Sequence, residues 1–264
     1  MVDRFGRDIT YLRISVTDRC NLRCHYCAPS RARLDRRDTL SFEEIVEVAR
    51  AAVSMGIRKV RITGGEPLLR PDIETLVSML ACIEGVDDLA MSTNALLLAE
   101  NAGKLAKAGL HRVNVSLDAT DPDRYRQITG GGNIRQVIAG IAAAQDAGLN
   151  PVKLNCVVKG SSTEPDALDV AGFANENGLE VRFIRQMDFL SGTFSVVEGG
   201  SGGDCGRCNR LRLSSDGQIR PCLFSDIRLS VRDLGAPTAL EQAVRCKPAR
   251  GAACSQSWIR SLGG

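Results

Sequence analysis

Hydrophobic and polar positions follow a repeated strand and helix pattern along most of the chain. From residue 56 to 184, a helical stretch, a glycine, an apolar residue, a short polar gap and an alternating apolar strand recur in that order. A glycine followed by an apolar residue is typical of a helix whose C′ residue takes the left-handed conformation. The glycines at these predicted helix ends are Gly56, Gly85, Gly109, Gly148 and Gly178.

The helices and strands alternate regularly. Ser41 and Glu44 have the spacing of a capping box at a helix start, and the apolar residues of 134–141 form one helix face. Strands are predicted near residues 10–17, 58–62, 88–92, 112–117, 152–158 and 180–184. Such alternation predicts an α/β protein with a parallel sheet, either a partial (β/α) barrel of about six βα units or an open doubly wound sheet.

Charged residues on the strands favour the barrel. Arg13, Lys59, Arg61, Lys153 and Arg182 alternate with apolar residues. If the apolar set faces the covering helices, the cations point into the lumen. Buried cations are costly without compensation, so either an anion binds there or lumenal Asp and Glu residues neutralise them.

Composition and charge exclude several classes of protein. The chain has 264 residues, 44% of them hydrophobic, which is enough for a large core. Its 34 basic and 31 acidic residues leave a net charge of +3, which indicates no nucleic acid or membrane surface as partner. We find no apolar run near the roughly 20 residues that span a bilayer and no signal-peptide core, and we expect a cytoplasmic protein.

Ten cysteines accompany only two histidines. A chain of this size does not need disulfides for stability, so reduced thiolates that bind a metal are the better interpretation. The shortage of histidine disfavours Cys/His zinc enzymes, although a four-cysteine zinc site stays open. Iron–sulfur chemistry is the leading hypothesis.

The first cysteine group has C-x₃-C-x₂-C spacing. Cys20, Cys24 and Cys27 follow the first strand, where barrel enzymes keep their chemistry. Three thiolates can hold three irons of a [4Fe-4S] cluster and leave the fourth iron open to a substrate. The alternative is a zinc or structural site.

A second group again supplies three ligands, Cys205, Cys208 and Cys222. Cys246 and Cys254 are possible fourth ligands, and either would give a closed zinc site or a closed auxiliary cluster. We expect a barrel over residues 1–188, a flexible Gly/Ser-rich linker over 189–204 that lets the second cluster swing, and a cluster region with the tail over 205–264. Two further cysteines, Cys82 and Cys156, are expected to be small buried hydrophobic residues.

Several motifs resemble a known family. Cys20 to Cys27, followed by Gly64 to Pro67, resembles the radical S-adenosylmethionine (SAM) superfamily. The glycines there would let the methionyl group of SAM approach the backbone. With Thr17 to Cys20, Asn114 to Asp118 and the terminal Gly263-Gly264, the chain resembles the GTP 3′,8-cyclase family of molybdenum cofactor biosynthesis.

This resemblance implies a lyase with two [4Fe-4S] clusters. It would use a 5′-deoxyadenosyl radical from SAM to convert GTP to (8S)-3′,8-cyclo-7,8-dihydroguanosine 5′-triphosphate. A flavodoxin or ferredoxin would donate electrons, and a cyclic pyranopterin synthase would take the product. The implied SAM-binding residues are Tyr26, Gly64, Gly65, Glu66, Ser116 and Met187. The implied GTP-binding residues are Arg13, Arg61, Ser92, Lys153, Arg210, Leu211 and Arg212, with Lys59 and Arg182 added because they share the lumenal face. Among these, Arg13, Arg210 and Arg212 are the predicted catalytic residues.

The chain also departs from the family pattern. The segment between Met187 and Cys205 and the tail after Cys222 are shorter, and Ala95 stands where the family usually has glycine. The Gly263-Gly264 tail either reaches the active site or is a frayed end. Two alternatives therefore stay open: a divergent radical SAM enzyme with another substrate, and a non-enzymatic metal-binding or regulatory protein.

Overall fold

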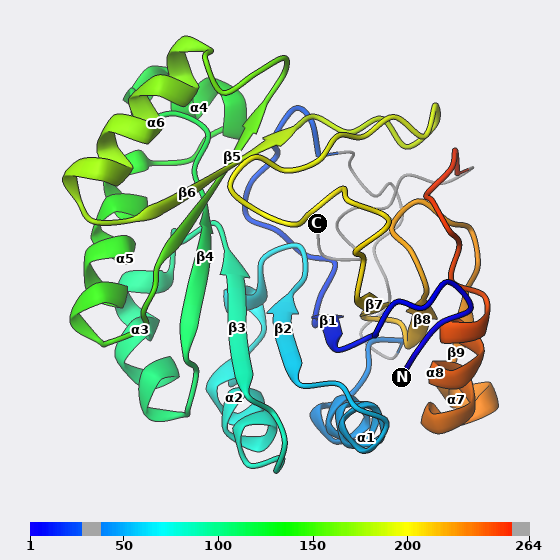
Figure 1. Ribbon diagram of the computed structural model, residues 1–264. Coiled ribbons are helices and arrows are strands. Elements are labelled where there is room, and N and C mark those ends of the chain that lie inside the picture. The colour runs from blue at the N-terminus through cyan, green and yellow to red at the C-terminus, as the bar shows by residue number, and fades with distance from the viewer. Residues whose placement is uncertain (28–37, 255–264) are drawn as a thin grey trace.

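The computed structural model describes residues 1–27 and 38–254, and its strands form one nine-stranded sheet of order β6-β5-β4-β3-β2-β1-β7-β8-β9 (Figure 1). Strands β1 to β7 are parallel, while β8 and β9 are antiparallel to their neighbours. The strands are β1 Tyr11–Ser15, β2 Lys59–Thr63, β3 Asp88–Thr93, β4 Arg112–Ser116, β5 Lys153–Val158, β6 Glu180–Arg185, β7 Arg210–Leu213, β8 Gln218–Arg220 and β9 Leu229–Ser230.

Helices cover the outer face of β1 to β6, as expected of a partial (β/α) barrel (Figure 1). All five predicted helix-ending glycines have positive φ, between 64° and 103°. The capping box of Ser41 and Glu44 is present. The helices are α1 Phe42–Ser54, α2 Ile73–Ala81, α3 Leu98–Lys107, α4 Pro122–Thr129, α5 Ile134–Asp146, α6 Pro165–Glu176, α7 Val231–Leu234 and α8 Ala236–Arg245, with a 3₁₀ turn η1 at Pro67–Leu69.

The C-terminal region continues the barrel sheet. Strand β7 pairs in parallel with β1, with Arg13 opposite Arg212. Helix α8 packs against α1 on the outer side. Strands β7 and β8, which flank the second cysteine group, therefore belong to the same sheet as β1, which the first group follows.

Residues 189–204, expected to be a flexible linker, contact the end of the barrel sheet and the C-terminal region. Backbone bridges join Asp188 to Thr193 and Phe183 to Glu198, so the segment folds back onto β6. The ring of Phe189 is 5% exposed and stacks on Phe224, with 4.7 Å between ring centroids. These contacts join the segment to β6 and to Phe224 at several points.

The alternation of the strands sorts their side chains as predicted. The apolar positions of β1 and β2 are fully buried against the helices, while Arg13 and Arg61 lie on the inner face. Cys156 is buried, as expected, but the prediction for Cys82 is wrong: it caps the C-terminus of α2 and is exposed. Within the described residues, no helix is long and apolar enough to cross a membrane.

Candidate functional site

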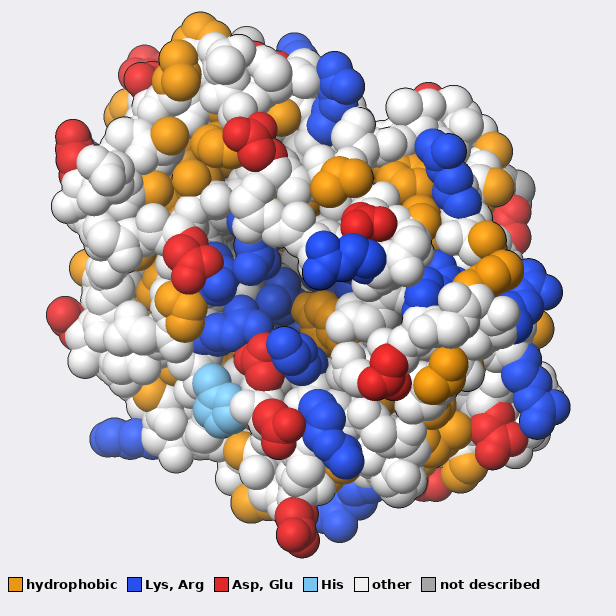
Figure 2. Space-filling model, in the orientation of Figure 1, with side chains coloured by type: hydrophobic (Ala, Val, Ile, Leu, Met, Phe, Trp, Pro, Cys, Tyr) orange, Lys and Arg blue, Asp and Glu red, His pale blue; other side chains and the backbone are white. Residues whose placement is uncertain are grey.

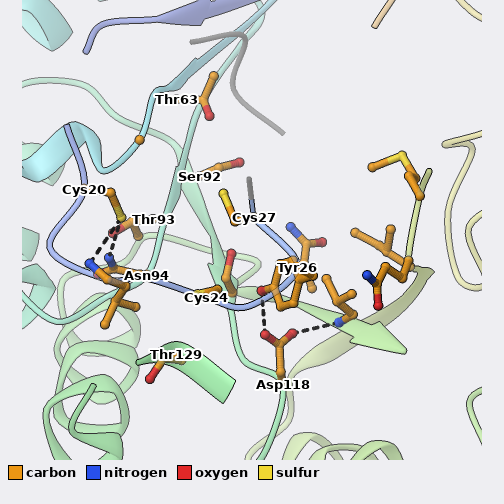
Figure 3. A pocket seen from close by; sticks show the side chains of 18 of the residues that line it. Cys20, Cys24, Tyr26, Cys27, Thr63, Ser92, Thr93, Asn94, Asp118 and Thr129 are labelled. Atoms are coloured by element: carbon orange, nitrogen blue, oxygen red, sulfur yellow. Dashed lines mark hydrogen bonds between the residues drawn. The ribbon is translucent and has the colours of Figure 1, made fainter. Parts of the chain in front are cut away.

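The first cysteine group lines a pocket of about 190 Å³ at the carboxyl ends of the strands (Figure 3). Cys20, Cys24 and Cys27 all face it. Every predicted SAM-binding residue except Glu66 lines this pocket too, since Tyr26, Gly64, Gly65, Ser116 and Met187 are all on its wall. Ser92, predicted to bind GTP, lies here, and its buried Oγ has no hydrogen-bond partner in the described part of the chain.

The backbone of Gly65 and Glu66 holds the cysteine loop against the tip of β2. The amide of Gly65 donates to the carbonyl of Thr17 at 2.7 Å, and the amide of Glu66 donates to the carbonyl of Arg19 at the same distance. A Cβ on Gly65 would lie 2.2 Å from the Arg19 oxygen. Glycine at position 65 is therefore required for the close contact between two loops of the protein, in addition to any approach of a bound methionyl group.

Glu66 does not face the pocket, contrary to its expected role in binding SAM. Its carboxylate is 1% exposed and accepts hydrogen bonds from the Thr93 hydroxyl and from the Leu68 and Asn94 amides. Burial raises the pKa of Glu66 to about 7, although these hydrogen bonds act in the opposite direction. Through Asn94, whose side chain donates to Asn21 at 2.7 Å, Glu66 instead supports the cysteine loop.

Tyr26 is anchored from the opposite side of the pocket. Its hydroxyl donates to the Asp118 carboxylate at 2.6 Å, and this carboxylate also accepts from the Val157 amide at 2.8 Å (Figure 3). Burial raises the pKa of both Tyr26 and Asp118. Asp118 thus links the cysteine loop to the ends of β4 and β5.

The chemistry of the first cysteine group suits a metal that displaces thiol protons. Burial, with added repulsion from Asp118 and Cys27, raises the pKa of Cys24 to about 12. Such a thiol becomes a thiolate only when a metal replaces its proton. In a [4Fe-4S] cluster each of the three thiolates would bind a different iron, whereas a structural zinc site needs a fourth protein ligand.

The second cysteine group lines a separate pocket of about 140 Å³. Cys205, Cys208 and Cys222 face it together with predicted catalytic residues Arg210 and Arg212. Arg13, the third of that set, is on the same wall. The pocket therefore unites the three predicted catalytic arginines with three possible cluster ligands.

Electrostatics differ sharply between the two cysteine groups. Burial by itself would raise the pKa of Cys208, but Lys247 and Arg210 lower it to about 7. The guanidinium of Arg210 lies 3.9 Å from the Cys208 sulfur. A thiolate at Cys208 is thus favoured even before metal binds, whereas burial raises the pKa of Cys222.

Three buried arginines cross adjacent strands in register. Arg13 on β1 pairs with Arg61 on β2 and with Arg212 on β7, and each is less than 10% exposed. Burial and the neighbouring guanidinium groups lower the pKa of Arg13 and, to about 10, that of Arg212. A bound polyanion would relieve this mutual repulsion, so the row is suited to phosphate.

The remaining predicted GTP-binding residues differ in their burial and in their polar partners. Figure 2 shows a hollow over β2 to β4 in which Lys and Arg side chains gather. Lys153 forms an ion pair with Glu180, so the expected acidic partner exists for this cation. Arg182 keeps a buried Nε without a partner among the described residues, and Lys59 is exposed at the start of β2. Leu211 does not fit: its side chain is fully buried in the outer apolar core and reaches neither pocket.

The two pockets share a wall, made by Ile184 and Met187. The two possible fourth ligands of the second group, Cys246 and Cys254, are not among the residues that line the second pocket. Cys246 is exposed at the end of α8, and the thiol of Cys254 donates to the Phe189 carbonyl at 3.5 Å. Gly263-Gly264 lies outside the described residues.

Four residues with evident roles were not assigned from the sequence. Asp118 and Asn94 follow β4 and β3, and this position after a strand was the available signal. Arg112 lies on the inner face of β4, where it pairs with Asp88 at 2.6 Å, and its place in the alternation could have identified it. Lys247 had no such signal, because it follows the end of a surface helix and lies 25 residues after Cys222, the last cysteine of the second group.

Comparison with known proteins adds family relationships. A model of the radical SAM superfamily matches residues 14–174. A GTP 3′,8-cyclase of Moorella thermoacetica is 41% identical over 304 aligned residues, which cover 94% of this chain and 94% of that protein. One of Heliobacterium modesticaldum is 38% identical over 315 residues, covering 98% and 96%. These alignments exceed the 264 residues of the chain, so the relatives contain segments that it lacks.

Solved structures resemble the fold. The structure of anSMEcpe with bound AdoMet has a TM-score of 0.65 at 14% identity and covers 96% of this chain and 88% of its own. Streptococcus suis SuiB bound to S-adenosylmethionine has a TM-score of 0.59 at 21% identity, with 69% and 41% covered. Both likenesses concern the fold alone.

Proposed function

The chain belongs to the radical SAM superfamily and, within it, to the GTP 3′,8-cyclase family, and we propose on this basis that it converts GTP to the 3′,8-cyclised nucleotide. The observation that carries the proposal is the adjacency of two cysteine-lined pockets at the end of an arginine row. Cleavage of SAM and binding of a nucleotide triphosphate require adjacent pockets, because the radical must form next to the bound substrate.

We propose that each pocket holds one [4Fe-4S] cluster with three cysteine ligands. Cys20, Cys24 and Cys27 would hold the first, and Cys205, Cys208 and Cys222 the second. When bound, the first cluster would supply the electron that cleaves SAM into methionine and a 5′-deoxyadenosyl radical, which would take hydrogen from the ribose 3′ carbon. Attack of that carbon on guanine C8 would then need one electron and one proton, which the reductant and solvent would supply.

The chain's own residues position the reactants. Tyr26, fixed by Asp118, and the backbone of Gly64 and Gly65 would hold SAM beside the first cluster. Arg13, Arg210 and Arg212 would bind the charged substrate beside the second. Arg61, Lys59, Lys153 and Arg182 would extend this binding along the triphosphate, where phosphate charge offsets the cost of burying cations.

Several partners follow from the same proposal. A one-electron donor such as a flavodoxin or ferredoxin would reduce the first cluster. A cyclic pyranopterin synthase would consume the product. All ten cysteines are described, and all are free thiols, which fits a reducing compartment such as the cytoplasm.

The direct test is an anaerobic incubation of the iron-loaded protein with SAM, GTP and a reductant. We expect 5′-deoxyadenosine and the cyclised nucleotide in equal amounts. Formation of 5′-deoxyadenosine with another nucleotide or a peptide, but not with GTP, would favour the divergent enzyme. Zinc in place of iron and no SAM cleavage would favour the non-enzymatic metal-binding protein.

A further inference from the structure

A buried lysine sits among the segments that carry the second cysteine group. Lys247, just after α8, is 1% exposed. Its Nζ donates to the Arg210 carbonyl at 2.6 Å and to the Pro221 carbonyl at 2.7 Å. Those carbonyls lie two residues after Cys208 and directly before Cys222, so one ammonium group joins the two segments that hold these ligands.

A second buried cation, Arg7, contacts both the segment of the third ligand, Cys205, and the residue that follows Lys247. Arg7 is 8% exposed and donates to the carbonyl of Cys205 at 2.7 Å and to that of Pro248 at 2.7 Å. Its guanidinium is paired with Asp3 at 2.6 Å, so its own charge is compensated. Lys247 has no carboxylate among its hydrogen-bond partners in the described chain, and its side chain also hydrogen-bonds to Cys208.

A buried ammonium group without a carboxylate is unfavourable unless another anion compensates it. A cluster bound by Cys208 and Cys222 would supply that negative charge, and the Cys208 side chain hydrogen-bonds to Lys247. A cation close to a cluster stabilises its reduced form more than its oxidised form, because reduction adds negative charge.

We propose that Lys247 is a positioning residue of the second cluster, which braces the segments of Cys208 and Cys222 and raises the reduction potential of the cluster they hold. The inference rests on the proposed function, because it requires a cluster at this site. It assigns Lys247 an electrostatic role in addition to its hydrogen bonds.

The test separates charge from packing. Lys247→Met removes the charge at similar side-chain length, Lys247→Gln keeps an amide donor without charge, and Lys247→Arg keeps the charge. All are made in full-length protein carrying Cys20→Ala, Cys24→Ala and Cys27→Ala, so that only the second cluster is loaded. Lys107→Met, on an exposed position of α3, removes an equal charge elsewhere.

Iron content and a redox titration followed by electron paramagnetic resonance are the readouts. We expect Lys247→Met and Lys247→Gln to disfavour cluster reduction at least tenfold, which is 59 mV for a one-electron couple. Lys247→Arg should recover most of the shift, and Lys107→Met should cause none. If Lys247→Met does not bind iron, the reduction potential of Lys247→Gln is the deciding measurement.

An iron-loaded neutral variant with an unchanged potential overturns the inference and leaves a packing role only. Failure of the proposed function looks different: the parent protein, before any change at Lys247, would hold zinc or no iron at the second site.

Discussion

Replacing Arg212 should change stability and GTP binding in opposite directions. Arg212 is 7% exposed on the inner face of β7, in register with Arg13. Burial and the nearby Arg210 lower its pKa to about 10, well below the ordinary value for arginine. Because folding lowers this pKa, the charged guanidinium disfavours the folded state at every pH below about 10, including pH 7.

The size of both effects follows from the structure. At about 1.4 kcal/mol per pKa unit, the charge of Arg212 costs the folded protein on the order of 3 kcal/mol. Arg212→Met should therefore raise the free energy of unfolding of the unliganded protein by about 1–3 kcal/mol, since some contacts are lost with the charge. A hydrogen bond to phosphate contributes about 1.5–3 kcal/mol, so GTP should bind roughly 10- to 100-fold more weakly.

Urea unfolding of the unloaded chain and calorimetric titration of the loaded, anaerobic protein measure the two quantities. Binding should decrease from GTP to GMP to guanosine and weaken with salt, and Arg212→Lys should restore only part of the affinity. Arg50→Met, on an exposed position of α1, is the control and should change neither quantity. A variant at Arg212 that is less stable without ligand and binds GTP normally would refute an anion site on this row.

Three further predictions test the two cysteine groups. Gly65→Ala should abolish iron loading at the first site, because its Cβ would meet the Arg19 oxygen. Gly103→Ala, which has open space in α3, should instead raise the free energy of unfolding by about 0.5–1 kcal/mol. Iron analysis and urea unfolding of both variants check these outcomes. Cys222→Ala should leave 5′-deoxyadenosine formation largely intact and remove the nucleotide product, and equal loss of both in a chromatographic assay would instead indicate a role in the overall fold. In unloaded protein at pH 7, iodoacetamide should modify Cys208 before Cys24, because about half of a thiol with a pKa of about 7 is ionised there; mass spectrometry that finds the reverse order would contradict the electrostatic assignment.

Much of the fold could be predicted from the chain itself, because its signals are local. Helix ends depend on a left-handed residue such as Gly109, and helix starts on a cap such as Ser41. Strand alternation placed Arg13 and Arg61 on the inner face, since successive side chains point to opposite sides. The same period put Leu211 in the outer core, although the resemblance had suggested a substrate contact.

The cysteine spacing and the family motifs likewise indicated the chemistry, since ligand type and loop position are properties of the sequence. The tertiary structure alone decided which way loop side chains point and which distant segments meet. Glu66 turns inward because three donors from the end of β3 and from η1 surround it, and Lys247 reaches Cys208 because α8 packs beside β8. The segment 189–204 contacts β6 and Phe224, which lie far from it in the sequence or in another element. Such contacts depend on the relative placement of elements far apart in the chain, which no local pattern of residues encodes.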